Sequence, residues 1–161
     1  NLEPLDLAEL AADSASEAAI LGQSLNLKVT VSASDSCMVR ADRHRLRQLL
    51  LNVTDNAVKY NRDGGHVDYR VFQEGGQACV DISSGGRGID DEELPHIFNR
   101  FFRSSTSRGT ESEGCGLGLS IAKWIAEEHG GTLTAQSSPD NTVLSLRLPL
   151  FGPNPNAMPK S

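Results

Sequence analysis

Gly114-Cys115-Gly116-Leu117-Gly118-Leu119 is a glycine-rich loop that runs directly into an amphipathic helix. Glycines at every second position disfavour helix and leave backbone N–H groups bare and closely approachable. Apolar residues recur at helical spacing on one expected face: Leu117, Ile121, Trp124 and Ile125. Such a loop aims unpaired N–H groups and the positive end of the helix dipole at a ligand. The stretch therefore predicts an anion site, with phosphate as the obvious ligand.

This loop differs from the two common phosphate-binding glycine motifs. A Walker loop would continue with Gly-Lys-Ser or Gly-Lys-Thr, and this loop does not. The dinucleotide-binding fingerprint follows directly on a strand, and its third glycine lies one residue further on. A plain hinge loop before an ordinary helix is the alternative, and the polar segments upstream argue against it.

A long helix is predicted from an N-cap at Asp42 to about Tyr60, because apolar residues recur at helical spacing. The residues expected to face inward are Leu46, Leu49, Leu50, Val53, Ala57 and Val58. Asn52, Asn56 and Lys59 share another face of this helix. Asparagine is at best neutral inside a helix, but its amide oxygen can hold a hard cation, and a nearby lysine can meet phosphate oxygens. A solvated polar face is the alternative.

Two further segments carry polar or aromatic patterns. Ser84-Gly85-Gly86-Arg87-Gly88-Ile89 is a glycine-rich turn at the end of a predicted strand, where the backbone could approach a flat ligand. A plain strand-ending loop explains it equally well. Over residues 98–103, three phenylalanines alternate with arginines and would anchor the Ser/Thr/Gly-rich segment that follows. Core packing alone would also account for the phenylalanines.

The remaining pattern predicts an α+β fold, an α/β sandwich with a mixed, largely antiparallel sheet and helices packed on one face. The other predicted elements are a helix over 5–22, a strand over 28–32 with 37–40 as its hairpin partner, strands near 66–73 and 77–83, a short helix over 91–98, and a hairpin at 131–137 and 142–148. The tail, 151–161, contains three prolines and is expected to be flexible.

Composition limits the function classes. The 161 residues are expected to form one domain, and the net charge of −6 argues against non-specific nucleic-acid binding. Three cysteines, Cys37, Cys79 and Cys115, show no pairing or metal pattern, which favours a reducing compartment and a cytoplasmic location. No apolar run approaches 18 residues, so we expect no membrane contact by this chain. It begins without a methionine and is expected to be part of a longer protein, which could be anchored in the membrane.

In this order, the motifs resemble the ATP-binding catalytic domain of sensor histidine kinases, in the superfamily of the gyrase, mismatch-repair and heat-shock-chaperone ATPases (the GHKL or Bergerat-type fold). The resemblance covers roughly residues 5–149 and implies a catalytic domain over 1–150. Its parts are an N box at 45–60, a first glycine box at 84–89, an F box at 94–103, an ATP lid at 102–114 and a second glycine box at 114–119. The turn His129-Gly130-Gly131 also matches, and the F box favours the kinases over their ATPase relatives.

The resemblance implies a site for ATP and Mg²⁺. Asn56 would ligate Mg²⁺ with support from Asn52, while Lys59 and Arg103 would contact phosphate. Around the adenine, the implied residues are Tyr60, Ser84, Gly86, Gly88 and Ile89. At the phosphates, they are Gly114, Gly116, Leu117, Gly118 and Leu119. Asn56, Lys59 and Arg103 would carry the catalytic contribution, which is positioning and charge neutralisation.

One position departs from the family pattern. Aligning on Gly86 and Gly88 puts Ser84 where these kinases have an aspartate that accepts a hydrogen bond from the adenine amino group. Asp81 lies three residues earlier in the strand, so its side chain should point to the other face. A neutral acceptor is weaker than a carboxylate, and the difference corresponds to about ten-fold in affinity. A smaller departure is Asn141, where the family usually has glycine.

The resemblance also implies partners that this chain does not contain. The phosphoacceptor histidine of these kinases sits in a separate dimerisation domain beside an acidic residue, and none of the four histidines here has that context. We expect the γ-phosphate to pass to that domain of the full-length protein and then to a response regulator. Two alternatives stay open at this point: a degenerate, nucleotide-free interaction module, suggested by Ser84, and a related ATPase or serine kinase.

Overall fold

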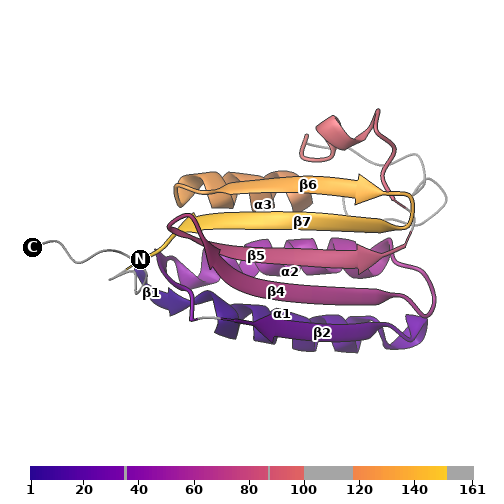
Figure 1. The fold of residues 1–161 in the computed structure, drawn as a ribbon, viewed down its shortest axis with the longest axis horizontal. Helices are drawn as coiled ribbons and strands as arrows, with labels where there is room; N and C mark the ends of the chain where they lie inside the picture. Colours follow the sequence, from indigo (N-terminus) through magenta and orange to yellow (C-terminus); the bar gives the residue numbers. More distant parts are fainter. Residues whose placement is uncertain (35, 87, 100–117, 152–161) are drawn as a thin grey trace, which may run out of the picture.

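The computed structural model describes residues 1–34, 36–86, 88–99 and 118–151, and in them three helices pack on one face of a five-stranded sheet (Figure 1). The helices are α1 (Leu7–Leu21), α2 (Arg43–Lys59) and α3 (Gly118–Glu128). The strands are β1 (Glu3–Asp6), β2 (Lys28–Ala33), β3 (Met38–Ala41), β4 (His66–Glu74), β5 (Gln77–Gly85), β6 (Thr132–Ser138) and β7 (Asn141–Pro149). Two short 3₁₀ turns, η1 (Gln23–Leu25) and η2 (Leu94–His96), lie in the connections.

The sheet has the strand order β2-β4-β5-β7-β6. β2 and β4 are parallel, and the other neighbouring pairs are antiparallel. β1 and β3 form a separate antiparallel pair. The predicted fold class, an α/β sandwich with a mixed, largely antiparallel sheet and helices on one face, is confirmed. The hairpins predicted between β4 and β5 and between β6 and β7 are also confirmed.

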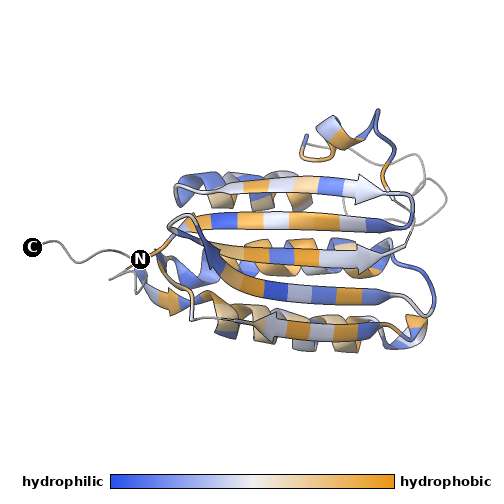
Figure 2. Cartoon of the chain, viewed as in Figure 1, coloured by the Kyte–Doolittle hydropathy of each residue, from blue (hydrophilic) through white to orange (hydrophobic). Residues whose placement is uncertain are grey.

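The core lies between the helices and one face of the sheet. Along the strands, apolar residues alternate with polar ones, as the alternating colours of Figure 2 show, and the apolar ones are buried. All six residues predicted to face inward from α2 are buried, and Leu46, Leu49, Leu50 and Val53 are fully so. Complete burial of large aliphatic side chains gives this layer most of its stability. It also fixes which face of α2 remains available for a ligand.

Two polar features hold α2 in place. The carboxylate of Asp42 accepts a hydrogen bond from the Arg45 N–H at 3.2 Å, which confirms the predicted N-cap and lowers the pKa of that carboxyl. In the core, the hydroxyls of Thr54 and Tyr69 lie 2.6 Å apart, and Tyr69 also donates to the Ser14 carbonyl at 3.4 Å. Burial raises the pKa of Tyr69 to about 12.

The predicted hairpin of residues 28–32 with 37–40 is wrong. β2 pairs in parallel with β4, and β3 pairs with β1, where Leu5 lies opposite Val39. Alternation marks which face of a strand is buried but does not identify its neighbour. The helix predicted over 5–22 correspondingly begins at Leu7, because residues 3–6 form β1.

Two other expectations need correction. The helix predicted over 91–98 is only the 3₁₀ turn η2, where Pro95 supplies no N–H for a continuing α-helix. Trp124 does not face the core: its side chain is 49% exposed, and the Arg45 guanidinium lies 5.4 Å from its ring centroid. α3 instead buries Ala122, Ile125 and Ala126.

Candidate nucleotide-binding site

The predicted site residues that the structure describes gather at one end of the sheet, at the right in Figure 1. The C-terminal end of α2, the loop after β5, the β6–β7 turn and the start of α3 meet there. These segments lie far apart in the chain and are brought together by the sheet order. The end of the N box, the described part of the first glycine box and Gly118 of the second therefore lie together.

Asn52 connects the N box to the second glycine box. Its Nδ2 group donates a hydrogen bond of 3.1 Å to the carbonyl oxygen of Gly118, the first residue of α3. Gly118 leaves room beside α2, since a Cβ built there would meet only the Asn52 Cβ, at 4.0 Å. The amide thus sets the distance between α2 and the end of the phosphate loop. Leu119 follows in the first turn of α3, half-buried against the core.

Asn56 and Lys59 lie one and two turns further along α2. Both side chains are half-buried, and neither forms a hydrogen bond or ion pair with another described residue. The Lys59 ammonium lies 5.9 Å from the ring centroid of Tyr60, the C-cap residue. An amide oxygen and a cation thus stand on the same helix end, both available to a ligand. An amide oxygen suits Mg²⁺ and an ammonium suits phosphate, so this donor set fits the implied ligands.

Gly86 brings the loop after β5 against the end of α2. Its φ of +136° is a conformation that side chains disfavour, and a Cβ there would lie 2.6 Å from the Tyr60 carbonyl oxygen. Gly88 is equally constrained, since its Cβ would lie 1.8 Å from the Ser138 carbonyl oxygen. Both glycines are therefore required by close backbone approach, on opposite sides of the loop.

The same loop is fastened to the β6–β7 turn by three N–H groups. The bonds run from Gly86 N to Asp140 O at 3.3 Å, from Gly88 N to Pro139 O at 3.1 Å and from Ile89 N to Ser137 Oγ at 2.7 Å. Sequence reasoning missed this attachment, because Ser137 lies 48 residues from Ile89 and looks like any strand serine. The loop predicted to shape the adenine pocket is thus held between α2 and the β6–β7 turn.

Ser84 lies on the helix-facing side of β5, with Val67 and Thr142 as its cross-strand neighbours. Its half-buried side chain makes no hydrogen bond to another described residue. Asp81 points to the opposite face, where it forms an ion pair with Arg147 at 2.9 Å. The structure therefore agrees that Asp81 does not stand in for the aspartate that the family pattern places at Ser84.

Several predicted site residues cannot be placed. Arg103, Gly114, Gly116 and Leu117 lie outside the described residues, as does the lid predicted over 102–114. Of the F box, Phe98 is half-buried, and the Lys123 ammonium of α3 lies 5.3 Å from its ring centroid. The start of the F box thus lies beside the helix that follows the second glycine box.

His129 has a structural role in this fold. Its Nε2 accepts the Asp42 N–H at 3.2 Å, and its Nδ1 lies 2.8 Å from the Ile125 carbonyl oxygen. Both contacts are satisfied together by the neutral ring with its proton on Nδ1. The histidine therefore joins the end of α3 to the N-cap of α2, at the end of the sheet remote from the site.

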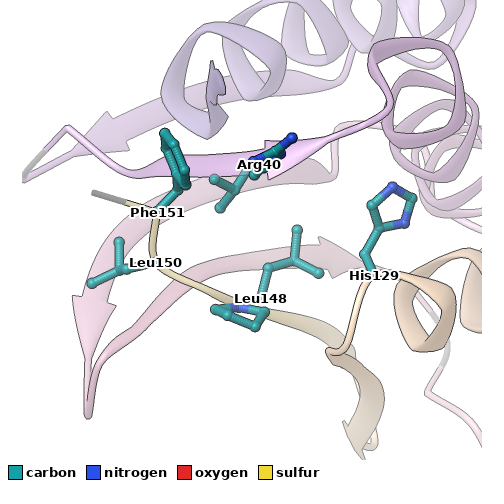
Figure 3. A pocket seen from close by; sticks show the side chains of 7 residues that line it. Arg40, His129, Leu148, Leu150 and Phe151 are labelled. Carbon is teal, nitrogen blue, oxygen red and sulfur yellow. The ribbon is translucent and has the colours of Figure 1, made fainter. Parts of the chain in front are cut away.

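A pocket lies at that remote end (Figure 3). Its lining residues are Val39, Arg40, His129, Leu148, Pro149, Leu150 and Phe151, and none of them is a predicted site residue.

The described residues contain neither a cluster of metal-binding side chains nor a membrane-spanning helix. No group of three or more His, Cys, Asp or Glu side chains there is arranged to hold a metal ion. No helix in that part of the chain is long and apolar enough to cross a membrane.

Comparison with known proteins identifies the family. Residues 41–152, more than half of the chain, match the family model of histidine kinase-, DNA gyrase B- and HSP90-like ATPases. The sensor protein SphS of Synechococcus elongatus is 34% identical over 92% of this chain and 38% of its own length. The mycobacterial sensor histidine kinase MprB superposes with a TM-score of 0.82 at 32% identity, over 92% of this chain and 98% of that chain.

The full-length ShkA structure, in complex with AMPPNP, shares the fold, with a TM-score of 0.80 at 24% identity over 93% of this chain and 31% of that one. This chain spans less than half the length of the curated relatives it matches, which are sensor kinases. Those relatives do not favour the alternative of a related ATPase. The chain therefore belongs to the histidine kinase-, DNA gyrase B- and HSP90-like ATPase family, as a catalytic domain of the sensor histidine kinase type.

Proposed function

We propose that this domain binds ATP with Mg²⁺ at the end of α2 and presents the γ-phosphate to a histidine on a separate dimerisation domain. The phosphoryl group would then pass to a response regulator. The observation that carries the proposal is the pair Asn56 and Lys59, whose side chains lie on one helix end and form no hydrogen bond or ion pair with another described residue. The complex of ShkA with AMPPNP supports it by analogy of fold.

The chain's own residues would act by binding and positioning. The Asn56 amide oxygen would ligate Mg²⁺, which neutralises phosphate charge, and the Lys59 ammonium would add a second positive contact. Asn52 would hold α3 at the distance that lets the N-terminal N–H groups of that helix face the phosphates. Contacts from Arg103 and from the glycines of 114–116 remain predictions. The acceptor histidine and its base lie in the other domain, so catalysis here would be orientation and charge neutralisation.

The base would lie between Tyr60 and the loop from Gly86 to Ile89, with Ser84 beneath it on β5. Ser84 would hold the base only weakly, because a hydroxyl binds an amino group less strongly than a carboxylate does. We therefore propose weak adenine binding with loose discrimination against guanine. The alternative of a nucleotide-free interaction module is not favoured by the relatives, which are sensor kinases, and a binding measurement tests it.

Calorimetric titration with ATP, with and without Mg²⁺, tests the function directly. We expect binding that is tighter with Mg²⁺, and Asn56→Ala should remove the Mg²⁺-dependent part because the cation loses an oxygen ligand. Gln48→Ala is the matched control, since Gln48 is an exposed amide two turns earlier on α2. Equal affinity with and without Mg²⁺ would contradict the role of Asn56, and no binding at all would favour the interaction module.

The wider assignments are proposals of the same kind. We propose a catalytic domain over residues 1–150 followed by a tail, with 102–114 as the lid over the nucleotide. The partners would be the dimerisation domain of the full-length protein and a response regulator, in the cytoplasm. Mixing this domain with a purified dimerisation domain of a related kinase and labelled ATP would test the transfer. Label appearing on the acceptor histidine supports the proposal, and ATP binding without any transfer would restrict it to nucleotide binding.

A further inference from the structure

The attachment of the loop after β5 to the β6–β7 turn includes one specific side chain. Two of its three bonds end on main-chain carbonyls, which any residue at positions 139 and 140 would offer. The third ends on the Ser137 hydroxyl, and at 2.7 Å it is the shortest of the three. Ser137 is half-buried on the helix-facing side of β6. It is therefore the one place in this attachment where the identity of a side chain decides whether a bond exists.

The Ser137 hydroxyl is oriented to accept. Its single proton has three acceptors within the turn, namely the Ser138 and Asn141 carbonyls, each at 3.4 Å, and the Thr142 hydroxyl at 3.3 Å. Donation to any of them leaves the oxygen lone pairs for the Ile89 N–H. On the other face of the sheet, a second side-chain link joins β5 to the β6–β7 turn: the Ser83 hydroxyl donates to the Asn141 amide oxygen at 3.0 Å. A glycine at 141, the usual family residue, could not form that link.

The register connects Ser137 to the base-facing part of the site. Ser137 lies opposite Thr142 on β7, and Thr142 lies opposite Ser84 on β5. The three hydroxyl-bearing residues thus form a row across the sheet, on the face that the helices cover. Ile89, the last residue of the loop, packs against the core. The hydrogen bond of the Ile89 N–H therefore holds the end of the loop, just as the bond of Gly86 holds its start.

We infer that Ser137 is a positioning residue of the nucleotide site: its hydroxyl holds Ile89 and so preorganises the loop that contacts the base. The inference rests on the proposed function. A loop held in its binding conformation loses less entropy when a ligand arrives. Without the hydroxyl, the Ile89 N–H loses its partner and the loop samples other conformations. Ser137 would then contribute to affinity without touching the nucleotide.

The test is ATP affinity in Ser137→Ala, measured with Mg²⁺ by calorimetry. We expect the dissociation constant to rise about five-fold, the size expected for one hydrogen bond. Ser137→Thr keeps the hydroxyl on a residue that suits a strand, and it should restore most of the affinity. Thr134→Ala is the matched control, because it removes an exposed hydroxyl from the same strand, away from the turn. Exchange of the Ile89 amide proton should be faster in Ser137→Ala and near the wild-type rate in Ser137→Thr.

The outcomes separate this inference from the proposed function. If the wild type binds ATP but Ser137→Ala binds equally well, the positioning role is refuted and the proposed function stands. Threonine failing to restore the affinity that alanine removes would also refute it, because the hydroxyl would not be the cause. If the wild type binds no nucleotide, the proposed function fails, and the positioning role falls with it.

Discussion

The Asn52 amide donates a 3.1 Å hydrogen bond to the Gly118 carbonyl, which ties the N-box helix to the first residue of the helix after the second glycine box. The two residues are 66 positions apart in the chain. Asn52 therefore acts as a spacer between the proposed metal-binding and phosphate-binding elements. Its neighbour one turn on, Asn56, has no such partner among the described residues, so the two asparagines on this face differ in their contacts.

Replacing Asn52 tests how much its hydrogen bond to Gly118 contributes to stability. Asn52→Ala removes one hydrogen bond, so the free energy of unfolding should fall by about 1 kcal/mol. Asn52→Asp should be more destabilising, because a carboxylate cannot donate to the Gly118 carbonyl and would repel it. Urea unfolding at pH 7 measures both. Asp55→Ala, an exposed position on the same helix, is the control. Equal stability of the aspartate variant and the wild type would show that the bond contributes nothing.

Tyr69 gives the domain a predicted stability limit at alkaline pH. Its folded-state pKa is raised to about 12 from the ordinary 10, because burial disfavours the phenolate. The stability that this group contributes is therefore complete below pH 10 and is lost as pH rises from 10 to 12. A shift of two units corresponds to at most about 2.7 kcal/mol.

Denaturant unfolding of the wild type and Tyr69→Phe at pH 8 and pH 11 checks this. At pH 8 the phenylalanine variant should be less stable by about 1–2 kcal/mol, because the buried Thr54 hydroxyl loses its partner. Between the two pH values it should lose less stability than the wild type does, since it has no buried phenol to ionise. Parallel losses in both proteins would mean that Tyr69 does not titrate in this range.

The sequence predicted those parts of the site that depend on local pattern. The Asn52, Asn56 and Lys59 spacing follows from helical periodicity, and the inward face of α2 was correct at every position. Gly86 and Gly88 were marked by composition, and the structure adds the reason, which is backbone approach from two sides. Each of these features is encoded within a few residues.

Features that depend on distant partners could not be predicted. The alternation over residues 28–32 indicated a strand. It did not indicate that this strand pairs in parallel with β4, which follows α2 in the chain. Trp124 fits the helical period, yet it lies at the edge of the packed face and contacts Arg45. Ser137 gave no signal at all, since its role exists only where Ile89 meets it. Periodicity indicates which face of a helix or strand is buried, whereas its neighbours depend on packing between distant parts of the chain.

Ser84→Asp tests the one position where the site departs from its family. Ser84 lies on the helix-facing side of β5, where an aspartate would present a charge-assisted acceptor to the adenine amino group. We expect ATP to bind about ten-fold more tightly. Selectivity over GTP should also sharpen, because a carboxylate cannot donate to the carbonyl that guanine presents there.

Ser84→Ala, titrated with both nucleotides, is the matched control and should bind ATP more weakly than the wild type. A wild type that already binds ATP tightly, with no gain from aspartate, would mean that another group holds the amino group. Thr142, the cross-strand neighbour of Ser84, would then be the first residue to replace, because its hydroxyl lies on the same face of the sheet. A gain with aspartate would instead show that the adenine pocket is intact and that the serine alone sets its weak affinity.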